Sequence, residues 1–173
     1  MGAAALPRVL RAQRLNADID ATLDQEDEAR ALRLWRPLAR AYPDDRAVMH
    51  GYVLALGRRY GEGDDLALLD EFLPAAERLL LLDASAWEAA SWAGTARLAR
   101  GRVFGEGAML RGAVAAFEEA ERRAGKDRHA RAMAIHGQAK ALAFFDWDEA
   151  TQRTRRALRL APDTASWAFD AVW

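Results

Sequence analysis

The sequence contains no cysteine, which excludes disulfide bonds, zinc–thiolate sites, iron–sulfur clusters and cysteine nucleophiles. It also has only five prolines in 173 residues, and only two of its 25 basic side chains are lysines. The internal apolar runs, such as residues 79–82 and 141–145, are far too short to cross a membrane. The first ten residues lack the basic start, long apolar stretch and cleavage site of a secretory signal. We therefore expect a soluble, cytoplasmic protein.

Alanine and arginine are abundant in this sequence, whereas proline and lysine are scarce. The chain has 40 alanines, and both alanine and arginine have high helix propensity. Hydrophobic residues make up 51% and charged residues 29%, which is typical of a folded globular protein. This composition predicts an all-α fold.

The formal charge is −1 but unevenly distributed, with a net −4 over residues 1–86 and a net +3 over residues 87–173. This polarity could orient a partner or favour head-to-tail self-association. It is too weak to predict nucleic-acid binding, which calls for a strongly basic domain.

An internal repeat is visible in the sequence. Residues 57–63 (Gly-Arg-Arg-Tyr-Gly-Glu-Gly) recur 44 positions later as residues 101–107 (Gly-Arg-Val-Phe-Gly-Glu-Gly). Three further matches share this offset: 54–55 with 98–99, 66 with 110, and 76–78 with 120–122. A repeat of this length is the signature of stacked helix pairs.

Apolar periodicity and turn residues predict four antiparallel helix pairs followed by a C-terminal capping helix. Suitable N-cap residues stand at positions 45, 65 and 163–164, residues 85–88 have the pattern of a capping box, and Gly125 can end a helix. Pro37 and Pro74 fall inside predicted helices, which must bend or divide there. The predicted helices are 8–23, 26–42, 46–60, 66–82, 86–103, 109–124, 128–143, 148–160 and 164–172.

The last pair resembles the tetratricopeptide repeat family. Residues 131–164 match its 34-residue pattern without a gap, including the turn at 146–150 and the helix end at 157–163 with Pro162. Residues 31, 35, 38 and 43 repeat this spacing in the first unit, and residues 113, 117 and 120 repeat it in the third. The middle units are longer at their Gly-Glu-Gly turns, which look like those of Sel1-type repeats. The resemblance implies one domain over residues 1–173, an all-α right-handed α-solenoid of about four helix pairs.

In that family the first helix of each pair lines a concave groove that binds a peptide or a helix of a partner protein. We therefore expect a protein–protein interaction adaptor without enzymatic activity, cofactor or metal. The family's asparagine-and-lysine clamp for a terminal carboxylate is not present at the corresponding positions. The register carried over from the family places these residues in the groove: Asn16, Asp20, His50, Leu54, Glu88, Ser91, Trp92, Thr95, Ile135, His136 and Ala139.

Two alternatives stay open at this point. Trp92 is either an interface anchor in the groove or part of the core. The C-terminal aromatics Trp167, Phe169 and Trp173 either cover the last helix pair or form a homodimer interface. A homo-oligomeric structural component is therefore the alternative function, with a small-molecule binder or enzyme as the next.

Patterns for other chemistry are weak. His129 and His136 are seven residues apart on one helix, about 10 Å along its axis, which is too far to share a metal. The acidic residues between 18 and 28 lack the glycine and terminal glutamate of a calcium-binding loop. The Gly-Glu-Gly turns lack the lysine of a phosphate-binding loop, and no nucleophile elbow or metalloprotease motif occurs.

Overall fold

The computed structural model describes residues 6–22, 25–61 and 66–162, except for the side chains at 15–16, 18–22, 25–27, 61 and 66. The chain divides into two compact units, which we call unit 1 (residues 1–83) and unit 2 (residues 84–173). Within the described residues the regular elements are helices and no strand occurs, so the all-α prediction is confirmed.

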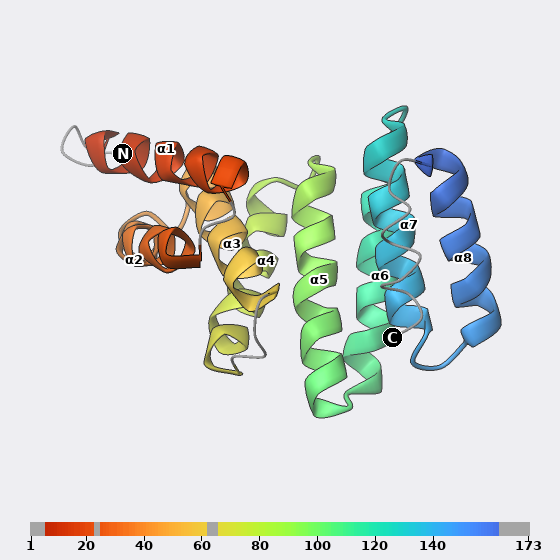
Figure 1. Ribbon diagram of the computed structural model, residues 1–173. Coiled ribbons are helices and arrows are strands. Elements are labelled where there is room, and N and C mark those ends of the chain that lie inside the picture. Colours follow the sequence, from red (N-terminus) through yellow and green to blue (C-terminus); the bar gives the residue numbers. More distant parts are fainter. Residues whose placement is uncertain (1–5, 23–24, 62–65, 163–173) are drawn as a thin grey trace. The chain divides into compact units, whose positions relative to one another are not determined.

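Unit 1 contains four α-helices of similar length. They are α1 (Leu6–Thr22), α2 (Gln25–Ala41), α3 (Arg46–Gly61) and α4 (Leu66–Leu82). Each packs on the next in the sequence, and α1 also contacts α3 (Figure 1). This order of contacts is that of a helical solenoid, in which one helix covers the apolar face of its neighbour.

Unit 2 repeats this arrangement with α5 (Trp87–Phe104), α6 (Gly107–Arg123), α7 (Arg128–Leu142) and α8 (Trp147–Leu160). The four helices run alternately in opposite directions (Figure 1), and each packs on the next while α5 also contacts α7. Both units therefore have the solenoid-like order predicted from the repeats. A right-handed superhelix over the whole chain and a single domain over residues 1–173 stay predictions.

The helix ends agree closely with the sequence prediction, because their caps are local. The Asp45 carboxylate accepts a hydrogen bond from the Val48 amide at 3.1 Å, as an N-cap should. Gly125 follows α6 with a left-handed φ of 57°, which also confirms its predicted role. The predicted capping box is corrected: Ala86, not Ser85, occupies the N-cap of α5, and Ala86 offers no side-chain cap. Residues 65 and 163–164 and the predicted final helix lie outside the described residues.

Pro37 and Pro74 lie inside α2 and α4, and each of these helices is continuous. The alternative that they divide into two shorter pieces was therefore wrong. Tertiary packing of their apolar faces outweighs the loss of one backbone hydrogen bond at each proline.

Close helix packing in both units depends on a large ring lying against glycine. In unit 1 the Trp35 side chain is fully buried on α2, and a Cβ atom at Gly51 of α3 would overlap its six-membered ring. In unit 2 the Phe117 ring of α6 contacts both neighbours: a Cβ at Gly94 of α5 or at Gly137 of α7 would lie 2.9 Å or 2.5 Å from it. Trp35 and Phe117 both belong to the spacing noted in the sequence, and both are buried in the core.

A polar cluster joins α2, α3 and α4 at the edge of unit 1's core. Glu71 accepts hydrogen bonds from Arg36 Nε at 2.8 Å and from the Tyr52 hydroxyl at 2.5 Å. Burial and the hydrogen bond to Glu71 raise the pKa of Tyr52 to about 12. Burial alone would raise the pKa of Glu71, but the hydrogen bonds from Tyr52 and Arg36 outweigh it and lower that pKa.

This cluster predicts a loss of stability in alkali. Tyr52 ionises near pH 10 when unfolded and near 12 when folded, so the folded state holds its proton longer. The stabilising contribution is complete below pH 10 and is lost as the pH rises towards 12. Urea unfolding followed by circular dichroism over this range should show the decline, and Tyr52→Phe should reduce it. An equally steep decline in Tyr52→Phe would contradict this origin.

Candidate partner-binding site

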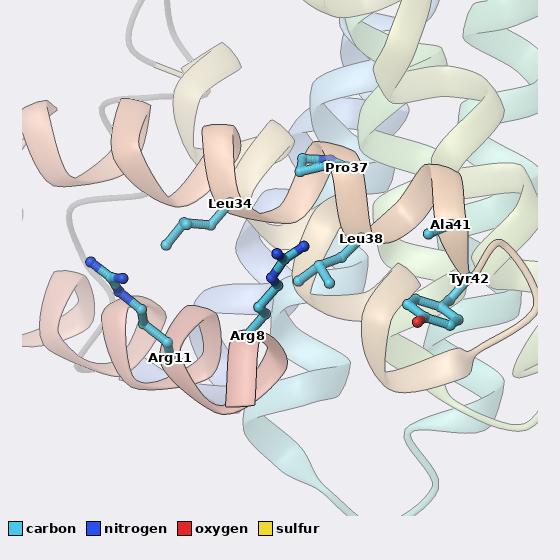
Figure 2. A pocket seen from close by; sticks show the side chains of 7 residues that line it. All are labelled: Arg8, Arg11, Leu34, Pro37, Leu38, Ala41 and Tyr42. Atoms are coloured by element: carbon cyan, nitrogen blue, oxygen red, sulfur yellow. The ribbon is translucent and has the colours of Figure 1, made fainter. Parts of the chain in front are cut away.

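A hollow of about 400 Å³ lies between α1 and α2 in unit 1. Figure 2 shows its lining side chains, with Arg8 and Arg11 extending from α1 towards side chains of α2. The volume is in the range of pockets that hold small ligands or single large side chains. The lining residues are Arg8, Arg11, Leu34, Pro37, Leu38, Ala41 and Tyr42.

The floor of this hollow is apolar. Leu34, Pro37, Leu38 and Ala41 have the i, i+3, i+4, i+7 spacing of one helical face. Leu38 is buried and Leu34 half-buried, whereas Pro37 and Ala41 are exposed. Helix α1 thus covers only part of this apolar face, and the remainder is accessible to another molecule.

Two guanidinium groups that have no anionic partner among the described residues flank the apolar floor. Among the described residues neither Arg8 nor Arg11 forms an ion pair, and both side chains are exposed. By contrast, Arg36 in the same unit pairs with Glu71. The Tyr42 hydroxyl likewise has no hydrogen bond to a described residue. The hollow therefore combines apolar surface with free donors, which suits an apolar side chain next to a carboxylate.

A second hollow, of about 620 Å³, lies among α6, α7 and α8 of unit 2, and its charges are already paired. Glu121 pairs with Arg131 and Arg156, and Arg153 lies 3.9 Å from Glu118. The fully buried Gln138 amide donates to Glu121 at 3.1 Å and accepts from Arg153. Because these groups satisfy one another, this hollow is part of the packing of unit 2 and offers less for recognition.

The groove residues expected from the sequence are distributed over both units. Asn16 and Asp20 belong to α1, but their side chains lie outside the described residues. His50 is exposed and Leu54 half-buried, and both lie on α3. None of the expected groove residues whose side chains the structure describes lines either hollow.

In unit 2 the structure brings four of the expected residues onto one face of α5. Glu88, Ser91, Trp92 and Thr95 are all half-buried there, and the Thr95 hydroxyl donates to the Ser91 carbonyl at 3.0 Å. Trp92 is neither fully exposed nor fully buried, so its intermediate position leaves both the anchor and the core interpretation possible.

On α7 the expected groove positions are all buried. His136 lies in the continuous buried run 134–139, together with Ile135 and Ala139. A buried run of this length is typical of a central helix with neighbours on several sides, and α7 contacts α5, α6 and α8.

The part of the chain that the structure describes contains neither a cluster of metal-ligating side chains nor a helix that could span a bilayer. No group of three or more histidine and carboxylate side chains there could hold a metal ion. No described helix is both long enough and apolar enough to span a bilayer.

The α1–α2 hollow was missed by the sequence reasoning, although part of its signal was present. The stripe of Leu34, Pro37, Leu38 and Ala41 is readable as an apolar helix face. The sequence does not reveal that α1 leaves part of this stripe open, or that Arg8 and Arg11 form no ion pair with a described residue. A comparison with models of known protein families found no match, and a comparison with curated proteins found no relative of this chain.

Proposed function

We propose that this chain is a protein-interaction adaptor that binds a peptide or a helix of a partner protein. The observation that supports it is the α1–α2 hollow, where two arginines without an ion-pair partner among the described residues flank an open apolar floor. A partner segment with one large apolar side chain and a nearby carboxylate would satisfy both features. The apolar anchor would supply most of the affinity, and the charged groups would supply orientation and specificity.

The proposal agrees with the solenoid-like order of helices in each unit, which leaves helix faces available for partners. It is also the function that the resemblance to tetratricopeptide repeats implies, although with a site at α1–α2 in addition to the expected groove. The half-buried face of α5 around Trp92 is the second surface to which a partner could bind.

Site-specific photo-crosslinking tests this proposal. With a photoreactive residue at Leu34, cells of the source organism should yield a discrete crosslinked protein. Arg8→Glu in the same chain should reduce the product about tenfold or more, because it places a like charge against the partner's carboxylate. Arg14→Glu is the matched control, since Arg14 is an exposed arginine of α1 that does not line the hollow.

Two outcomes would contradict the proposal. The first is the absence of any product from Leu34 while a probe at Trp92 does give one, which would move the site to α5. The second is an equal loss of product with Arg8→Glu and Arg14→Glu, which would indicate a nonspecific charge effect.

A further inference from the structure

We infer that the partner segment in the α1–α2 hollow is the α7–α8 turn of a second copy of this chain, so that the protein associates head to tail. This inference rests on the proposed function and names its partner. It is supported by the complementary chemistry of the two surfaces. The hollow offers apolar surface and guanidinium groups, and the turn offers aromatic side chains and a carboxylate.

The α7–α8 turn exposes three large aromatic side chains close together. Phe144, Phe145 and Trp147 are 50%, 52% and 55% exposed, respectively. Single exposed apolar residues are ordinary, but three exposed aromatics within four positions of one turn are a concentration of apolar surface of the kind that marks interaction sites. Tryptophan and phenylalanine are also the residue types that most often anchor interfaces.

This turn is held in one conformation by its own hydrogen bonds. The amides of Phe145 and Asp146 donate to the Leu142 carbonyl at 2.9 Å and 2.7 Å. The Asp146 carboxylate then caps α8 by accepting from the Glu149 amide at 3.0 Å. Because its backbone is fixed before association, the turn would lose little conformational entropy on binding.

Carboxylates alternate with the aromatics in this turn. Asp146 and Asp148 flank Trp147, and both are exposed. Asp148 forms no ion pair with a described residue, whereas Glu149 pairs with Arg153 at 2.6 Å. The turn therefore presents a large apolar side chain with at least one free carboxylate next to it.

The hollow of unit 1 has the opposite pattern: an apolar floor flanked by the exposed guanidinium groups of Arg8 and Arg11, which pair with no carboxylate of the described residues. An indole inserted beside Leu34 would bring the neighbouring Asp148 into the range of a guanidinium group. Guanidinium groups also stack favourably on aromatic faces. The two cations of the hollow therefore complement the carboxylate and the aromatics of the turn, and both surfaces occur in the same polypeptide.

The hollow and the turn are different surfaces of the chain, so a contact between the hollow of one copy and the turn of another is heterologous. After one such contact, one copy keeps its turn unoccupied and the other keeps its hollow unoccupied, so further copies can add until a ring closes. This distinguishes the proposal from a symmetric dimer, in which one patch contacts itself.

Sedimentation velocity of the full chain over a range of concentrations provides the first test. The mean mass should rise with concentration above the 19.2 kDa of one chain. Trp147→Ala and the double variant Arg8→Glu/Arg11→Glu should each weaken association by about tenfold or more. Phe104→Ala is the control, because Phe104 is 49% exposed at a different turn of unit 2 and stacks with Arg100.

Mixing the two weakened variants is the decisive experiment. The Trp147→Ala copy keeps an intact hollow and the Arg8→Glu/Arg11→Glu copy keeps an intact turn, so together they should form a one-to-one dimer that does not grow further. A mixture that stays monomeric would overturn head-to-tail association. Circular dichroism of each variant checks folding, and Asp148→Arg serves as a second turn variant.

The Leu34 crosslink separates failure of this inference from failure of the proposed function. A crosslink to residues 144–148 of another copy supports both. A crosslink to a different protein, with the chain itself monomeric, supports the adaptor and overturns self-association. A crosslink within one chain at all concentrations also overturns self-association, and no crosslink at all counts against both.

Discussion

Trp35→Ala is expected to lower the free energy of unfolding of unit 1 by about 3–5 kcal/mol, the usual loss for a buried tryptophan. Trp35 is 0% exposed and packs against Gly51 on the neighbouring helix. Its removal would leave a cavity between α2 and α3, which their backbones can close only in part. Urea unfolding followed by circular dichroism would measure the loss, since the signal does not depend on tryptophan fluorescence.

Trp35→Phe provides the control for this prediction. The indole N–H of Trp35 is buried without an acceptor among the described residues, so phenylalanine removes an unsatisfied donor while keeping most of the ring. The loss should therefore be clearly smaller than for alanine. Equal losses for the two variants would contradict the claim that ring volume is what matters at this position.

Gly137→Ala is expected to destabilise unit 2 by about 1–3 kcal/mol, the usual cost of inserting a methyl group into a packed core. The new Cβ would lie 2.5 Å from the Phe117 ring. The ring cannot move away freely, because Gly94 of α5 also lies against it. Unfolding in urea would measure this effect, and comparison with Trp35→Ala would assign each transition to its unit.

Gly112→Ala is the matched control and should have the opposite sign. Gly112 also lies inside a helix, but a Cβ there would meet its nearest neighbour, Arg97 Cδ, at an ordinary 3.5 Å. The substitution should therefore stabilise α6 by about 0.5–1 kcal/mol through its higher helix propensity. A stabilised Gly137→Ala variant would show that α7 does not pack closely on Phe117.

Much of the fold was predictable because its determinants are local. The cap at Asp45 and the left-handed Gly125 lie in short stretches whose own residues fix the conformation. The core aromatics Trp35 and Phe117 follow from helical periodicity. Ala86 at the N-cap of α5 was not predictable, since alanine carries no capping signal of its own.

The candidate site was far less predictable, because it depends on what neighbouring helices leave uncovered. Periodicity identifies the apolar face of α2 but not the part of it that α1 fails to cover. Whether an arginine is paired depends on distant residues: Arg36 meets Glu71 from α4, whereas Arg8 meets no carboxylate of the described chain. Likewise, nothing local distinguishes the aromatics of a packed turn from the exposed Phe144 and Phe145.

The order in which the helices contact one another also has a consequence for folding kinetics. In each unit the main contacts join helices that are first or second neighbours in the sequence. The loops that must close during folding are therefore short, and their entropic cost is small. Low contact order of this kind places helical domains among the fastest folders, in the microsecond to millisecond range. Each unit should thus complete most of its contacts soon after its last helix leaves the ribosome.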